Sequence, residues 1–142
     1  MREIKFRGKS IDEWVYGFLL RTNKFDLEHG EDIKYSIQTD NREQGEYEKY
    51  FITNDDTIGQ YTGLKDKNGT EIYEGDIFEV INSHEERFIV WVEYSEKYAE
   101  FVIRHSSNIV VDNEPLGDVN TSETVVILGN IHDNPELISW GG

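Results

Sequence analysis

The chain has 142 residues, a length that suits one domain or two small ones sharing a core. It contains no Cys, which excludes disulfide frameworks and thiolate metal sites. Its 29 acidic and 14 basic residues give a net charge of −15, so the chain as a whole repels nucleic-acid phosphates and anionic membrane surfaces.

Short strands are predicted along the first part of the chain. Residues 4–6 form one, and residues 14–20 form a second that is apolar on both faces, which indicates a sheet covered on both sides. The acidic stretch 23–32 is predicted to be a loop. Residues 33–37 alternate with a period of two, as half-buried strands do. The polar stretch 39–49 is predicted to be a loop or a domain boundary.

The segment 58–77 carries the clearest turn chemistry in the chain. Asn68-Gly69 favours a two-residue hairpin, because both residues accept the positive φ of a type I′ turn. Gly59 and Gly63 suit a bulge or the close approach of another backbone. Gly75-Asp76 then predicts a corner before a new strand at residues 77–81.

Further strands are predicted in the last part of the chain, followed by a short helix. The Asp-Asn-Pro-Glu sequence at 133–136 begins that helix, because Asn or Asp caps, Pro suits the first turn, and an acid favours the positive end of the dipole. The predicted strands lie at 87–94, 98–104, 109–111 and 124–128, and the strand 124–128 is predicted to be central in its sheet. A loop is predicted at 113–121 and the helix at 135–140.

These elements together predict a mainly β fold. Short strands separated by glycine-rich turns favour a small SH3-like barrel built from the middle and C-terminal part of the chain. A smaller N-terminal β region would add a second layer, and a short C-terminal helix would close the chain. The predicted domains are 1–52 and 53–142, with one shared core as the alternative.

No residue pattern identifies a catalytic, cofactor-binding or metal site. Residues 65–69 superficially resemble an EF-hand loop, but Leu64 and Gly75 would occupy ligand positions that need oxygen. The remaining candidates each have a structural alternative. A cation site or a solvated loop would explain Glu28–Asp32 with His29. An oriented imidazole or a helix cap would explain His132-Asp133-Asn134. A shared proton or a turn would explain Glu74 with Asp76.

Aromatic residues are more numerous than the interior of one small barrel needs. Core packing and a homo-oligomeric interface both explain them, since Tyr and Trp are enriched at interfaces. A base-stacking platform is disfavoured, because no basic groove accompanies the aromatics. The residues concerned are Tyr16, Phe18, Tyr61, Tyr73, Trp91, Tyr94, Tyr98 and Phe101.

The segments 1–9, 14–19, 59–77 and 128–137 closely resemble the YopX-like family of phage and prophage proteins. The most specific of them reads G-Q-Y-T-G-L-K-D-K-N-G from Gly59 to Gly69 and continues as E-I-Y-E-G-D-I from Glu71 to Ile77. The resemblance implies a mainly β fold, a phage origin and self-association. It implies no established activity and supplies no catalytic residues.

We therefore expect a non-enzymatic, self-associating interaction protein without a cofactor. No membrane span or signal peptide is evident in the sequence, which predicts a location in the cytoplasm of a bacterial host. The first alternative is an acidic inhibitor that imitates DNA towards a basic host protein. The second is a metal-dependent enzyme built around the Glu28–Asp32 loop or His132.

Overall fold

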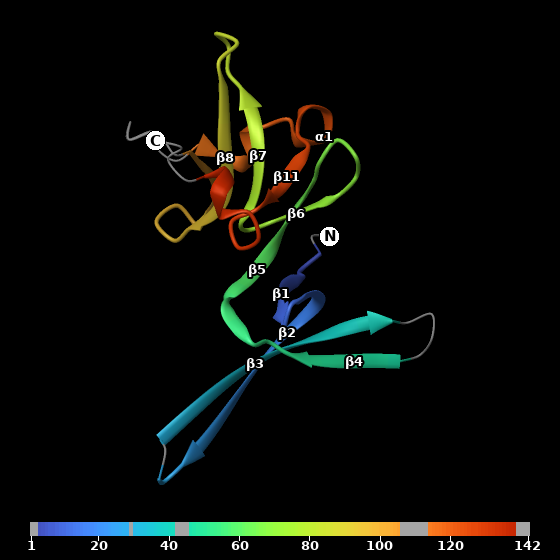
Figure 1. The fold of residues 1–142 in the computed structure, drawn as a ribbon, viewed down its shortest axis with the longest axis vertical. Coiled ribbons are helices and arrows are strands. Elements are labelled where there is room, and N and C mark those ends of the chain that lie inside the picture. Colours follow the sequence, from blue (N-terminus) through green and yellow to red (C-terminus); the bar gives the residue numbers. More distant parts are fainter. Residues whose placement is uncertain (1–2, 29, 42–45, 106–113, 139–142) are drawn as a thin grey trace. The chain divides into compact units, whose positions relative to one another are not determined.

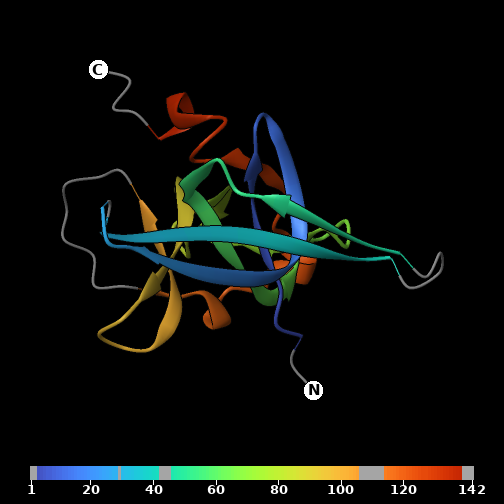
Figure 2. The same cartoon turned by 90° about the horizontal axis from the view of Figure 1, so that it is seen from below.

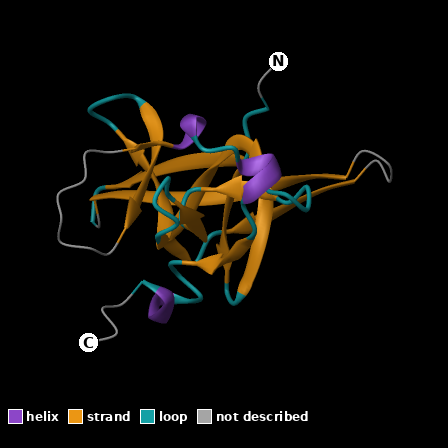
Figure 3. Ribbon diagram, turned by 90° about the horizontal axis from the view of Figure 1, so that it is seen from above, coloured by secondary structure: helices purple, strands orange, loops and turns teal. Residues whose placement is uncertain are grey.

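The computed structural model describes residues 3–28, 30–41, 46–105 and 114–138. Strands dominate these residues, and the helices among them are limited to single short turns (Figure 3), which confirms the mainly β prediction. The chain divides into two compact units, Met1–Tyr61 (unit 1) and Thr62–Gly142 (unit 2). The division falls within a strand, further along the chain than the predicted boundary after Ile52. Within the described residues, no helix is both long and apolar enough to cross a bilayer.

Unit 1 is an antiparallel sheet in the order β4-β3-β2-β1-β5. Its strands are β1 (Phe6–Ser10), β2 (Glu13–Asp26), β3 (Gly30–Asn41), β4 (Glu46–Phe51) and the first part of β5 (Asn54–Lys65). The strands β2 and β3 run side by side as a long hairpin, and β4 continues from the far end of β3 (Figures 1 and 2). Pairing continues from Phe18 opposite Gln38 to Asp26 opposite Gly30.

Two predicted loops of unit 1 are strands, and both predictions were wrong for the same reason. Residues 23–26 and 30–32 form the paired outer end of the β2–β3 hairpin, and the described residues of 39–49 belong to β3 and β4. Backbone pairing between adjacent strands holds these residues extended although their side chains are polar, so hydrophobic alternation could not reveal them. Residues 42–45 lie outside the described part of the chain.

The strand β2 changes its partner at Gly17. It pairs with β1 from Glu13 to Gly17, and with β3 from Phe18 onward. A Cβ atom at position 17 would lie 2.1 Å from the carbonyl oxygen of Gln38, so only glycine allows β3 to approach this closely. Gly17 therefore lets one strand join the two halves of the sheet.

The core of unit 1 lies on one face of this sheet. Val15, Ile37 and Ile52 are buried at its centre. Successive residues of a strand point to opposite faces, so Val15 and Leu19 of β2 lie on this face while Tyr16 and Phe18 lie on the other. The residues packed around the centre are Phe6, Leu19, Tyr35, Tyr50 and Ile58.

Unit 2 contains a second antiparallel sheet, in the order β10-β9-β8-β7-β11. Its strands are β7 (Asp76–Ile81), β8 (Arg87–Ser95), β9 (Glu100–His105), β10 (Glu114–Pro115) and β11 (Ile127–Asn130), while β6 (Glu71–Tyr73) pairs with the end of β5. Its core consists of Ile72, Phe78, Val90, Val92, Ile103, Leu116 and Val125. In the described residues β10 and β11 end the sheet without pairing to each other, so a closed SH3-like barrel is not confirmed.

The C-terminal elements differ from the prediction in two places. Residues 124–128 are not a central strand, because α1 (Thr121–Thr124) occupies the start of that range and β11 lies at the sheet edge. The carbonyl of Asn120 accepts hydrogen bonds from both the N–H and the hydroxyl of Thr124, which turns the chain before the strand begins. Of the helix predicted at 135–140, the described residues form only the 3-10 turn η2 (Pro135–Leu137), and residues 139–140 lie outside the described part of the chain. A similar turn, η1, spans Leu116–Asp118. The predicted strand 109–111 lies outside the described residues.

Candidate functional site

In the glycine-rich segment 58–77, the carboxylate of Asp66 holds the hairpin together. This residue is only 3% exposed. One carboxylate oxygen accepts hydrogen bonds from the N–H groups of Asn68 and Thr70, both at 2.9 Å, and the other accepts one from Ile127 at 3.2 Å. Asp66 thus closes the hairpin and also binds it to β11.

The turn of this hairpin is not the predicted type I′ turn. A type I′ turn needs a positive φ at Asn68. Among the described non-glycine residues, positive φ occurs only at Ile11, Glu85 and Ala99, so the φ of Asn68 is negative. Gly69 has a φ of 82°, and its N–H donates to the Asp66 carbonyl at 3.0 Å. This pattern fits a type I turn followed by a glycine in the left-handed region. The carboxylate of Asp66 supplies the hydrogen bonds that favour this form.

The carboxylate pair Glu74 and Asp76 also belongs to a turn. Gly75 has a φ of 90°, and β7 begins immediately after it, which confirms the predicted corner. The buried Asp76 carboxylate accepts a hydrogen bond from the N–H of Tyr73 at 2.7 Å. Asp76 therefore holds backbone in place, as a turn residue does.

The described residues around the histidine candidates take part in hydrogen bonds within the chain. His29 lies outside the described residues, and its neighbour Glu31 accepts a hydrogen bond from Asn23 at 3.0 Å. The backbone N–H groups of His132 and Asp133 both donate to the Asn130 side-chain oxygen, so this segment is an Asn-organised turn. Across the described ranges, no group of three or more His, Asp or Glu side chains could hold a metal ion.

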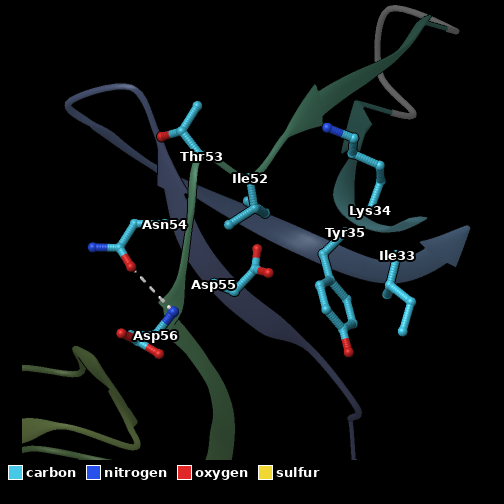
Figure 4. Close-up of a pocket in the computed structure, with 8 residues that line it drawn as sticks. All are labelled: Ile33, Lys34, Tyr35, Ile52, Thr53, Asn54, Asp55 and Asp56. Carbon is cyan, nitrogen blue, oxygen red and sulfur yellow. Dashed lines mark hydrogen bonds between the residues drawn. The ribbon is translucent and has the colours of Figure 1, made fainter. Parts of the chain in front are cut away.

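A polar pocket of about 330 Å³ lies in unit 1, beside the connection between β4 and β5 (Figure 4). Asp55 lies between Ile52 and Tyr35, whereas Asp56 lies next to Asn54, whose side-chain oxygen accepts the Asp56 N–H at 3.1 Å. The two carboxylates therefore do not converge on one point. The other lining residues are Ile33, Lys34 and Thr53.

One face of unit 1 exposes large apolar side chains, and we call it the outer face. It lies opposite the core and consists of Tyr16, Phe18, Leu20, Tyr47 and Phe51. The register places these residues together: Leu20 and Phe51 both pair with Ser36, and Phe18 pairs with Gln38. Directly paired residues lie on the same side of a sheet, so the five form one surface across β2, β3 and β4.

The outer face was predicted only in part. Tyr16 and Phe18 were two of the eight aromatic residues named as a surplus, of which Tyr61 and Tyr73 are buried in the core. Phe18 is 49% exposed and Phe51 is 62% exposed. Tyr47 and Phe51 were not identified as surface residues, although their separation of four residues places them on the same face of a strand. On the opposite side of β4, Tyr50 donates a hydrogen bond to Glu48, which raises the pKa of Tyr50 above its ordinary value of 10.0. Tyr50 therefore stays neutral at physiological pH.

Unit 2 contains a larger groove of about 810 Å³, which falls within the range of known ligand sites, about 300–1,000 Å³. Its lining comes from β7, β8, β9, β10, β11 and the short helical turns between them. The apolar walls include Val80, Phe88, Ile103, Val119, Val126 and Leu128. The acidic residues at this groove are Glu79, Glu114 and Asp118, and Arg87 is bonded to Glu79 at 2.7 Å.

A solved structure and a family model both match this chain over almost its whole length. The chain matches the crystal structure of protein EF1440 from Enterococcus faecalis with a TM-score of 0.51 and 25% sequence identity, covering 98% of this chain and 100% of that one. Among curated proteins, none matches the chain. The model of the YopX protein family matches residues 5–139, which cover most of both units, and the chain therefore belongs to the YopX protein family.

Proposed function

We propose that the protein is a non-catalytic phage or prophage accessory protein that works by self-association, and that two copies meet through the outer face of unit 1. The observation that carries this proposal is the gathering of five large apolar side chains on one solvent-exposed sheet face. A contiguous exposed apolar patch is typical of interaction sites in soluble proteins. The first part of β2 is apolar on both faces, as in a sheet that is covered on both sides.

A second copy suits this face better than a basic protein does. The register places Ser36, Gln38, Asp40 and Lys49 among the five apolar residues, with Asp40 opposite Tyr47, so one acidic and one basic residue offset each other there. The Lys49 ammonium lies 5.6 Å from the Phe51 ring centre, so its charge rests on an aromatic surface of the same face. Two copies could thus pack sheet against sheet about a two-fold axis with little net charge between the five apolar residues.

A charge placed in the outer face is expected to separate the copies. The variants Phe18→Glu and Phe51→Glu should weaken association at least tenfold, about 1.4 kcal/mol, because each would bury a carboxylate against apolar side chains. The matched control is Phe25→Glu, an exposed aromatic residue on the opposite face of the same hairpin. Association is measured by sedimentation velocity over a dilution series, with circular dichroism as the check on folding.

The result that would contradict the proposal is equally specific. It is a Phe18→Glu or Phe51→Glu variant that remains folded and associates as tightly as the wild-type chain. A loss of association in Phe25→Glu alone would also contradict it, because that outcome would assign the interface to the other face of the hairpin.

A second candidate function rests on the distribution of charge. Unit 2 contains 16 acidic and five basic residues, so it carries −11 of the total net charge of −15. We propose it as the part of the chain that would face a basic protein, including a DNA-binding protein of the host. Such binding would weaken with added salt, and duplex DNA would compete for the same partner.

A further inference from the structure

We propose that the groove of unit 2 binds a basic peptide segment of a partner protein, taking up its apolar side chains while the acidic residues of the groove face its Lys or Arg side chains. This inference refines the second candidate function, because it names the surface and the chemistry by which unit 2 would recognise a basic partner. It is independent of self-association through the outer face of unit 1.

The walls of the groove expose apolar side chains that a partner could contact. Leu128 is 50% exposed and Val126 is 43% exposed, and both line the groove. Phe88 and Val80 lie further in, where they pack against the buried core of unit 2. The groove thus continues the core to the surface, and a partner side chain placed in it would gain contacts with both sets of residues.

The charged side chains of the groove favour a basic occupant. Arg87 is bonded to Glu79, so these two charges offset each other. Glu114 and Asp118 remain, and both are exposed. The neutral amides are used within the chain, since Asn82 accepts the N–H groups of His84 and Glu86, and Asn120 donates to Glu123. The groove therefore attracts cations and disfavours nucleotides, fatty acids and other anions.

A peptide fits these features better than a second copy or a small molecule. A second copy seated groove against groove would bring Glu114 and Asp118 of both chains together, which like-charge repulsion opposes. Small-molecule sites enclose most of the ligand surface, whereas Ile81, Val126 and Leu128 of this groove are largely open to solvent. An extended segment can instead place some side chains in the groove and leave the rest in water.

The experiment uses three synthetic peptides of equal length, measured by fluorescence anisotropy with the full chain. One alternates Leu and Lys, one alternates Ser and Lys, and one alternates Leu and Glu. The Leu-Lys peptide is expected to bind at least tenfold more tightly than either of the others, because only it offers both apolar side chains and positive charge. Its affinity is expected to fall as salt is added.

Paired variants then locate the binding site. Leu128→Asp is expected to weaken Leu-Lys binding at least tenfold, whereas Leu137→Asp, at an exposed leucine outside the groove, should not. The double variant Glu114→Lys with Asp118→Lys should weaken it similarly, whereas Glu96→Lys should not. All the replaced side chains are exposed, and the charge variants keep the test valid if Leu128→Asp fails to fold.

Two outcomes would overturn the inference. If the Ser-Lys peptide binds as tightly as the Leu-Lys peptide, unit 2 attracts basic chains by charge alone, and the second candidate function stands without the groove. If Leu-Lys binding is unchanged in the groove variants, or if Leu128→Asp alters the mass of the assembly and no peptide binds, the groove is not a peptide site.

Discussion

Replacing Asp66 with Ala is expected to lower the free energy of unfolding by about 3 kcal/mol. The buried carboxylate accepts hydrogen bonds from three backbone N–H groups, two in its own hairpin and one at Ile127. One hydrogen bond to a charged group contributes about 1.5–3 kcal/mol, and the loss is expected to be near that of one bond because the N–H groups of the exposed Asn68 and Thr70 can bind water instead. The stabilities are compared by urea denaturation followed by circular dichroism.

Two further variants separate this explanation from a general effect of lost charge. Asp66→Asn keeps one acceptor oxygen and is expected to lose less stability than Asp66→Ala. Glu96→Gln removes a charge from an exposed turn of unit 2 and is expected to change stability by less than about 0.5 kcal/mol. Equal stability of Asp66→Ala and the wild-type chain would show that the hairpin does not depend on this carboxylate.

Replacing Gly17 with Ala is expected to destabilise unit 1 by about 3 kcal/mol. The new methyl group would lie 2.1 Å from the carbonyl oxygen of Gln38, and backbone atoms cannot move aside as a flexible side chain can. Overpacking typically costs about 1–3 kcal/mol, and this site is at the upper end because β2 passes from β1 to β3 here. Hydrogen exchange should show faster exchange in β2 and β3 than in the wild-type chain.

The control for this substitution is Gly117→Ala. A Cβ atom at Gly117 would meet no atom within 4 Å, so the same methyl group should cost little there. If Gly17→Ala were as stable as Gly117→Ala, the close approach of β2 and β3 at Gln38 would not be a feature of the folded protein.

The parts of the fold that the sequence predicted are those whose information is local. The corner at Gly75-Asp76 follows from glycine's access to positive φ, and β7 and β8 follow from apolar runs between turn residues. The position of the hairpin at Asn68-Gly69 was also predictable. Its turn type was not, because the carboxylate of Asp66 decides it through hydrogen bonds to residues two and four positions later.

The parts that the sequence did not predict depend on pairing between distant residues. The outer end of the β2–β3 hairpin is polar and acidic, and its extended form comes from the register that places Asn23 opposite Ile33. The outer face arises in the same way, since Leu20 and Phe51 meet only through Ser36 of the strand between them. No local pattern contains this three-strand arrangement, although the apolar residues on both faces of β2 pointed to a second covering layer.

The mass of the wild-type chain in solution tests the central claim most directly. Light scattering coupled to gel filtration, repeated across a dilution series, should give a multiple of the 16.6 kDa chain mass. The same measurement on the folded variant Phe18→Glu combined with Phe51→Glu should shift towards 16.6 kDa. A wild-type mass of 16.6 kDa at every concentration would contradict self-association through the outer face, as would a double variant that assembles as the wild-type chain does.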